Sequence, residues 1–224
     1  MSMKYEKNSY IDVIKANKPE PMDYSVSFSN DRSRTKFIKK VERLIRMSME
    51  YRDYIVFLRE NVGMDACAFF SNVSKDTSKR IKIEVHHAPF TLYDICDIVL
   101  CKYEKSGLPI NALDISDEVM MLHYKNMVGL VPLSKTLHEV IHSSDKLIIP
   151  ATVIYGNYKA ILQEYEKYDI PEYIYDKCDK LIEQTKMIKN DTFDVLKRKF
   201  IYIDVDGFQV AQKIEDENKE EGVA

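Results

Sequence analysis

The sequence of 224 residues lacks several features that would assign it to a particular class of protein. No apolar run approaches the ~20 residues needed to cross a bilayer, and the opening MSMKYEKNSY lacks the apolar segment of a secretion signal. The four cysteines lie far apart without a C-x-x-C pair, which argues against a disulfide scaffold and a cysteine-based zinc site. We therefore expect a cytoplasmic protein with reduced thiols and no membrane partner.

An excess of charge of one sign is also missing, since the net charge is only -3. The distribution is uneven, because residues 31–46 hold seven basic side chains and residues 213–224 (KIEDENKEEGVA) are acidic. A basic stripe can contact phosphates even when an acidic tail cancels its charge, although a solvated helix face is an equally good interpretation. The residues predicted to bind nucleic acid here are Arg32, Arg34, Lys36, Lys39, Lys40 and Arg43, with Arg46 completing the run.

Hydrophobic periodicity predicts an α+β protein with a core of ordinary size, given 45% hydrophobic residues. One long amphipathic helix is expected over residues 33–61, and alternation in RIKIEVHH predicts a half-buried strand over 80–87. Thr91 with Asp94 is typical of a helix start, and a second helix is expected from Asp114 or Ser116. Further segments follow in order: an extended LVPL, a helix capped by Ser134 or Thr136, helices near 157–168 and 171–189, and a strand and turn in FIYIDVDG.

The predicted organisation has four parts. Residues 1–79 form an arm and the basic helix, and residues 80–150 form the central unit with a helical insertion at about 91–126. Residues 151–212 form a mainly helical extension with a short strand, and an acidic, disordered tail covers residues 213–224.

All five histidines fall between positions 86 and 142, which makes this region a candidate for metal binding or acid-base chemistry. His86 and His87 are neighbours at a strand end, so their side chains point to opposite faces of the strand. His138 and His142 are one helical turn apart and share a face, as two ligands of one metal ion would. The fifth, His123, lies on an apolar helical stripe and is better explained as a buried, hydrogen-bonded side chain.

The pentapeptide HEVIH, residues 138–142, also fits the pattern of a zinc protease, in which Glu139 would act as the base between two zinc ligands. That interpretation needs a third ligand downstream and gives no purpose to the pair His86 and His87. A five-residue pattern with two free positions is weakly specific. The protease therefore stays as the less favoured alternative.

The combination of IEVHHAPFTLYDI with NMVGLVPLSKTLHEVIH resembles the HNH endonucleases, and more closely the HNH-type proteins of bacteriophages. The resemblance covers residues 80–143. It implies a ββα-metal core: a strand ending in paired histidines, a second strand, and a helix that presents histidines to a divalent cation. Here that core would carry a helical insertion and mainly helical N- and C-terminal extensions.

The same resemblance implies the site residues. His87 would be the general base, and His86, His138 and His142 would hold a divalent ion, with Mg, Mn, Zn and Ni all open. Glu84 lies on the same strand face as His86 and could fix the tautomer of that ring, although an exposed strand carboxylate is the favoured interpretation. The asparagine that orients the base in the family falls on Gly129, nine residues before His138, so Asn126 is the residue assigned to that role.

The expected activity is metal-dependent hydrolysis of DNA phosphodiester bonds, in which the ion stabilises charge on the leaving oxygen and the base activates water. Lys135, beside the start of the metal-binding helix, is a further expected DNA contact. The principal alternative is a catalytically inactive phage factor that binds DNA or protein, because a shared fold does not guarantee activity. The insertion would then be available to a phage or host protein partner.

Overall fold

The computed structural model describes residues 26–70, 73–74, 77–78, 80–143 and 148–187, together with the backbone of residues 203–205 and 208–210. The first 25 residues of the expected arm and the whole of the expected acidic tail lie outside these ranges. Within them, the chain is α+β, as predicted. No helix in the described ranges combines the length and the apolar character required to span a membrane.

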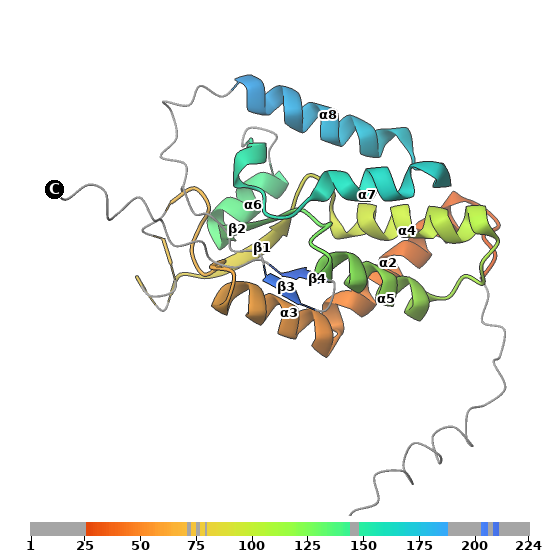
Figure 1. The fold of residues 1–224 in the computed structure, drawn as a ribbon, viewed down its shortest axis with the longest axis horizontal. Helices are drawn as coiled ribbons and strands as arrows, with labels where there is room; N and C mark the ends of the chain where they lie inside the picture. Colours follow the sequence, from red (N-terminus) through yellow and green to blue (C-terminus); the bar gives the residue numbers. More distant parts are fainter. Residues whose placement is uncertain are drawn as a thin grey trace, which may run out of the picture.

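The described elements are mostly helices, with a few very short strands between them (Figure 1). In chain order they are α2 (Asp31–Met47), α3 (Met49–Glu60), β1 (Ile83–His87), α4 (Leu92–Ser106), α5 (Ala112–Tyr124), β2 (Leu130–Ser134), α6 (Lys135–Ser143), the 3-10 turn η1 (Ala151–Val153), α7 (Tyr158–Tyr165), η2 (Glu166–Tyr168), α8 (Glu172–Met187), β3 (Ile203–Val205) and β4 (Phe208–Val210).

The single long helix predicted over residues 33–61 is two helices, which meet at Ser48. Ser48 has an extended ψ of 149°, so the helical hydrogen-bond ladder stops there. Its hydroxyl oxygen accepts the Tyr51 N–H and so caps the start of α3. The apolar period continues across the break, which is why the sequence reads as one helix.

Side-chain caps fix the starts of the two helices of the insertion. Thr91 and Asp94 form the expected capping box before α4. The start of α5 was placed too late, because Asn111 caps it by accepting the N–H groups of Leu113 and Asp114.

The sheet that carries the histidines is a two-stranded antiparallel pair, β1 with β2, in which His86 lies opposite Val131 and His87 opposite Leu130. The two faces of this pair differ. The face of His87 and Leu130 is turned toward the helical core, and the face of His86 and Val131 is turned toward α6. Figure 1 shows α3 on one side of the strands and α6 on the other.

One large hydrophobic cluster joins side chains from α2, α3, α4, α5, α7 and α8, and a smaller one lies between the sheet and α6. The helices of the insertion, α4 and α5, pack on α2 within the large cluster. All four cysteines are buried and free, as expected. The insertion is therefore part of the main core and covers one face of the histidine-bearing strands.

Candidate metal centre

The three predicted ligands meet in space although the second lies 52 positions after the first in the sequence. Each of His86, His138 and His142 offers one ring nitrogen, and these nitrogens all lie within 4.8 Å of one another. We call these three side chains the histidine trio. His86 comes from the end of β1, and the other two come from successive turns of α6, which β2 leads into directly. Ser134 accepts the Leu137 N–H and so helps to start that helix.

The spacing within α6 suits a tetrahedral ion. Nε2 of His138 lies 3.2 Å from Nε2 of His142. If an ion lay about 2.1 Å from both atoms, the angle between its two bonds to nitrogen would be roughly 100°, close to the tetrahedral value. The three nitrogens of the trio all lie within 4.8 Å of one another, and a tetrahedral ion would hold them about 3.4 Å apart.

A carboxylate fixes the orientation of one ring of the trio. Glu84 Oε2 lies 2.7 Å from Nδ1 of His138, whereas the ring predicted to be its partner was that of His86. A carboxylate accepts hydrogen bonds, so Nδ1 of His138 carries a proton and Nε2 is the atom that can face a metal ion. Burial, with the neighbouring His138 and His142, lowers the pKa of His86 to about 4, so His86 is in its neutral, ligating form at pH 7.

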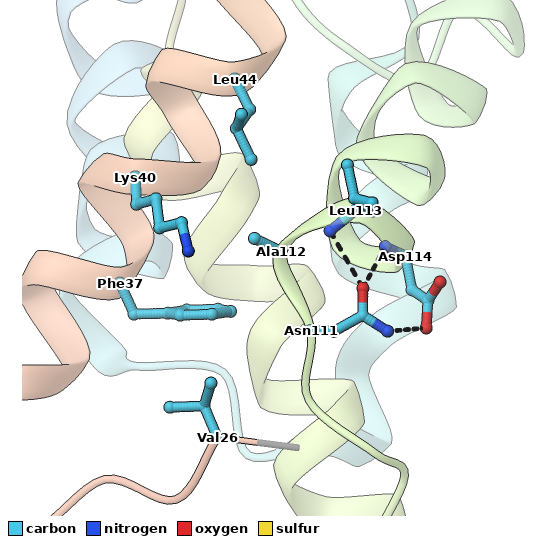
Figure 2. Close-up of a pocket in the computed structure, with 8 residues that line it drawn as sticks. All are labelled: Val26, Phe37, Lys40, Leu44, Asn111, Ala112, Leu113 and Asp114. Carbon is cyan, nitrogen blue, oxygen red and sulfur yellow. Dashed lines mark hydrogen bonds between the residues drawn. The ribbon is translucent and has the colours of Figure 1, made fainter. Parts of the chain in front are cut away.

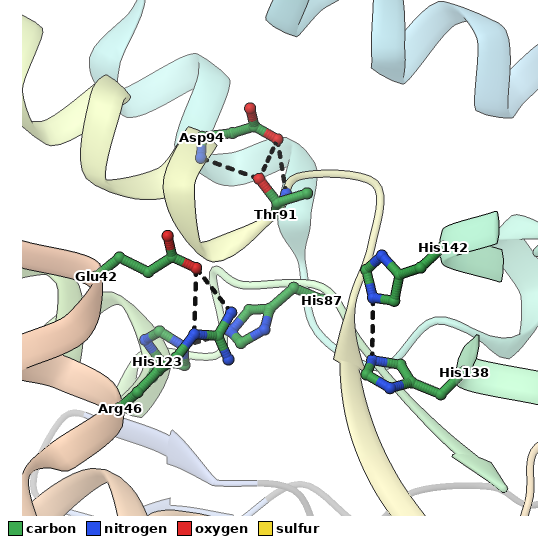
Figure 3. A network of polar contacts seen from close by, with 8 residues as sticks. All are labelled: Glu42, Arg46, His87, Thr91, Asp94, His123, His138 and His142. Carbon is green, nitrogen blue, oxygen red and sulfur yellow. Dashed lines mark hydrogen bonds and ion pairs between the residues drawn. The ribbon is translucent and has the colours of Figure 1, made fainter. Parts of the chain in front are cut away.

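A general base is expected to face outward, toward the substrate, but His87 faces inward. Its side chain is 6% exposed and lies on the opposite face of β1 from the trio, among α3 and α5. Its ring lies parallel to that of Tyr51, and its Nε2 is 3.0 Å from Nε2 of His123. Figure 3 shows His87 and His123 on one side of the strand and His138 and His142 on the other. The helical insertion therefore occupies the side from which a substrate would reach His87.

The hydrogen bonds of this buried pair assign its protons. Nδ1 of His123 is 2.8 Å from the Val119 carbonyl oxygen, which only accepts, so Nδ1 carries the proton. Nε2 of His123 then accepts, and Nε2–H of His87 donates to it. Burial is the main cause that lowers the pKa of both rings, to about 4 for His123. The buried histidine expected at position 123 is confirmed.

His123 makes the fold sensitive to acid. Its pKa in the folded chain is about 4 against 6.5 when exposed, so below pH 6.5 the unfolded chain takes up a proton that the folded chain excludes. Above pH 6.5 His123 leaves the free energy of unfolding undiminished. Between pH 6.5 and its pKa of about 4 in the folded chain, it lowers that free energy by up to about 1.4 kcal/mol per pH unit. Urea melts in EDTA between pH 7 and 5 should show a smaller slope of unfolding free energy against pH for His123→Gln than for wild type. His142→Gln, a change at an exposed histidine, is the matched control. Equal slopes for wild type and His123→Gln would show that His123 is not the source of the acid sensitivity.

Neither candidate for the orienting asparagine is placed to act on His87. Asn126 is buried with a φ of 54°, and its side-chain oxygen accepts the hydroxyl of Tyr155. Gly129 has no side chain that could orient a base. Its carbonyl oxygen accepts the Ala88 N–H at 3.0 Å, and this bond continues the β1–β2 ladder. A Cβ at position 129 would lie 1.8 Å from the Ala88 carbonyl oxygen. The backbone pairing therefore excludes any larger residue there.

Most of the predicted basic contacts are exposed, but Arg34 is not available. It points inward from α2 and pairs with Asp97 at 2.5 Å and Glu104 at 3.1 Å. Helical period explains this, since Arg34 lies nearly opposite the other basic residues of the helix. Lys135 is exposed and lies 3.5 Å from Glu139 on the same helix.

That ion pair bears on the protease alternative. The side chain of Glu139 is 65% exposed and pairs along the surface of α6 with Lys135. The carboxylate that touches the trio is Glu84, from β1. The position of Glu139 gives no support to its use as a base beside a metal ion.

One comparison with known proteins finds a match. Residues 2–218 match the model of the family described as bacteriophage G278-like virion protein. The chain belongs to this family. No curated protein and no solved structure matches it. The expected phage origin is thus confirmed at the level of the family, and the histidine trio is a feature of this virion protein that the family description leaves without a role.

Proposed function

We propose that this virion protein is a metal-dependent phosphodiesterase of the HNH type, with His86, His138 and His142 as the ligands of a divalent ion. The observation that carries the proposal is the meeting of three imidazoles at the junction of two antiparallel strands and the helix that follows them. Three protein ligands leave a coordination position open, which is the usual difference between a catalytic site and a closed structural one.

The donor set favours a particular group of ions. Imidazole nitrogens suit Zn, Ni, Mn and similar transition metals, whereas Mg binds through carboxylates and water. Glu84 would hold the ring of His138 in the ligating orientation and raise its basicity. When bound, the ion would polarise a phosphoryl oxygen and lower the pKa of a bound water toward neutrality. That property removes the need for a separate histidine base and is compatible with the buried position of His87.

A second function is supported by the environment of His87. This ring is sealed between Tyr51 and His123, and position 129 cannot hold the asparagine that the HNH resemblance requires. A chain that uses the trio only to bind a metal ion would serve as a binding module of the particle. Cleavage under metal, measured below, separates the two functions.

The test is nicking of supercoiled plasmid by EDTA-treated protein supplied with Zn, Ni, Mn or Mg. Wild type should nick with at least one transition metal, and His142→Ala should be at least about 100-fold slower, because the ion's charge stabilisation is lost. Glu139→Ala, an exposed change on the same helix, is the matched control and should nick like wild type.

The outcomes are exclusive. Wild type that binds metal but nicks under none of the four ions rejects the phosphodiesterase and supports the binding module. Equal nicking by wild type and His142→Ala assigns the cleavage to a contaminant. Casein hydrolysis that disappears in Glu139→Ala would instead establish the protease.

A further inference from the structure

One face of α2 carries five exposed cations that the fold does not use. They are Arg32, Lys36, Lys39, Lys40 and Arg43, and we call them the basic face of α2. At 3.6 residues per turn they fall within an arc of about 100° and a length of about 16 Å. Within the part of the chain that the structure describes, none of them forms an ion pair.

The spacing of these charges costs helix stability. Lys36 lies four residues from both Arg32 and Lys40, and Lys39 lies four residues from Arg43. Like charges at this separation are neighbours on the helix surface and repel. The opposite side of α2 does the packing, through Phe37, Ile38, Val41 and Ile45. A row of repelling charges without internal partners is explained by an anionic partner outside the chain.

A pocket of about 660 Å³ adjoins this face at Lys40. Figure 2 shows Phe37, Lys40 and Leu44 of α2 across from the first turn of α5, where Leu113 and its neighbours close the other side. The walls are mostly apolar, and Asn111 and Asp114 supply polar groups at one side. An apolar slot next to a row of cations has the composition of sites that take unpaired bases and the phosphates between them.

We propose that the basic face of α2 binds the phosphates of a nucleic-acid single strand and that the adjoining pocket accepts one of its bases. A single strand is required because the bases of a duplex are paired and stacked and cannot enter a pocket. This inference rests on the proposed function only for the cleavage of the bound strand, not for its binding. Arg46 continues the row in the last turn of α2, where it pairs with Glu42.

Binding is measured by fluorescence anisotropy with a labelled 20-nucleotide DNA strand, the same sequence in RNA, and the DNA duplex, all in EDTA. The variant is Lys36→Gln, Lys39→Gln and Arg43→Gln together. The matched control is Lys159→Gln, Lys180→Gln and Lys186→Gln, three exposed cations of α7 and α8. Removing three phosphate contacts should lower the slope of log affinity against log salt by about 2 and weaken binding at least about 10-fold at 0.1 M salt.

The pocket is tested by Leu113→Asn, with Leu108→Asn as the matched control in the preceding loop; both leucines are exposed in wild type. Loss of an apolar wall should weaken single-strand binding at least about 5-fold, within the range for one stacked base. Preference for DNA or for RNA identifies the strand, and either supports the proposal. Wild-type affinity in the triple variant rejects the basic face, and duplex binding as tight as single-strand binding rejects the base pocket.

EDTA keeps this test separate from the metal centre. A protein that binds single strands through α2 but never nicks plasmid rejects the proposed function and keeps this inference. A protein that nicks plasmid, and whose triple variant binds single strands as tightly as wild type, keeps the proposed function and rejects this inference.

Discussion

Zinc added to the EDTA-treated protein should raise its melting temperature, and His142→Ala should abolish the rise. An ion that binds only the folded chain, at a free concentration 100 times its dissociation constant, stabilises it by about 2.7 kcal/mol. For a domain of this length that corresponds to roughly 5–10 °C. His142 is an exposed surface residue whose loss does not disturb the core, so the variant remains folded and the comparison concerns the ligand alone. Differential scanning fluorimetry against zinc concentration measures the effect.

Two further variants show whether the rise comes from the trio. Glu84→Gln should keep the site but weaken zinc affinity about 10- to 100-fold, because the partner that orients His138 is lost. Glu139→Ala, on the exposed side of α6, should respond like wild type. A rise of the same size in His142→Ala would mean that zinc binds elsewhere, and no rise in wild type would remove the metal centre.

The meeting of the trio was predictable because it depends on short-range geometry and one strand pairing. Two histidines four apart on a helix share a face, and adjacent strand residues point to opposite faces. The strand Ile83–His87 and the helix Lys135–Ser143 then needed only to be neighbours, which the antiparallel pairing of β1 with β2 provides. Binding of an ion by the three side chains stays a prediction.

The surroundings of His87 were not predictable from local pattern. Its partner His123 lies 36 residues away, on a helix whose position is set by packing against α2 and α4. A strand-end histidine has the same sequence signature whether a substrate or a helix covers it. The inward position of Arg34, in contrast, follows from helical period and was missed because the basic run was treated as one stripe.

Gly129→Asn should unfold the protein or cost more than about 4 kcal/mol of unfolding free energy. The Cβ of any residue at this position would lie 1.8 Å from the Ala88 carbonyl oxygen and 3.0 Å from Cγ2 of Ile154. The first contact is with backbone that is held by the Ala88 N–H bond to the Gly129 carbonyl, so it cannot be relieved by a rotamer change. Urea denaturation monitored by circular dichroism, with soluble yield as a second readout, measures the cost.

Gly107→Asn is the matched control. Gly107 ends α4 with a φ of +62°, nothing lies within 4 Å of its would-be Cβ, and asparagine tolerates this left-handed conformation, so the cost should stay within about 1 kcal/mol. If Gly129→Asn were equally mild, β1 and β2 would have to pair differently from the register that places His86 in the trio and His87 in the core. The same change that would restore the asparagine of HNH nucleases therefore tests the strand pairing on which the metal centre depends.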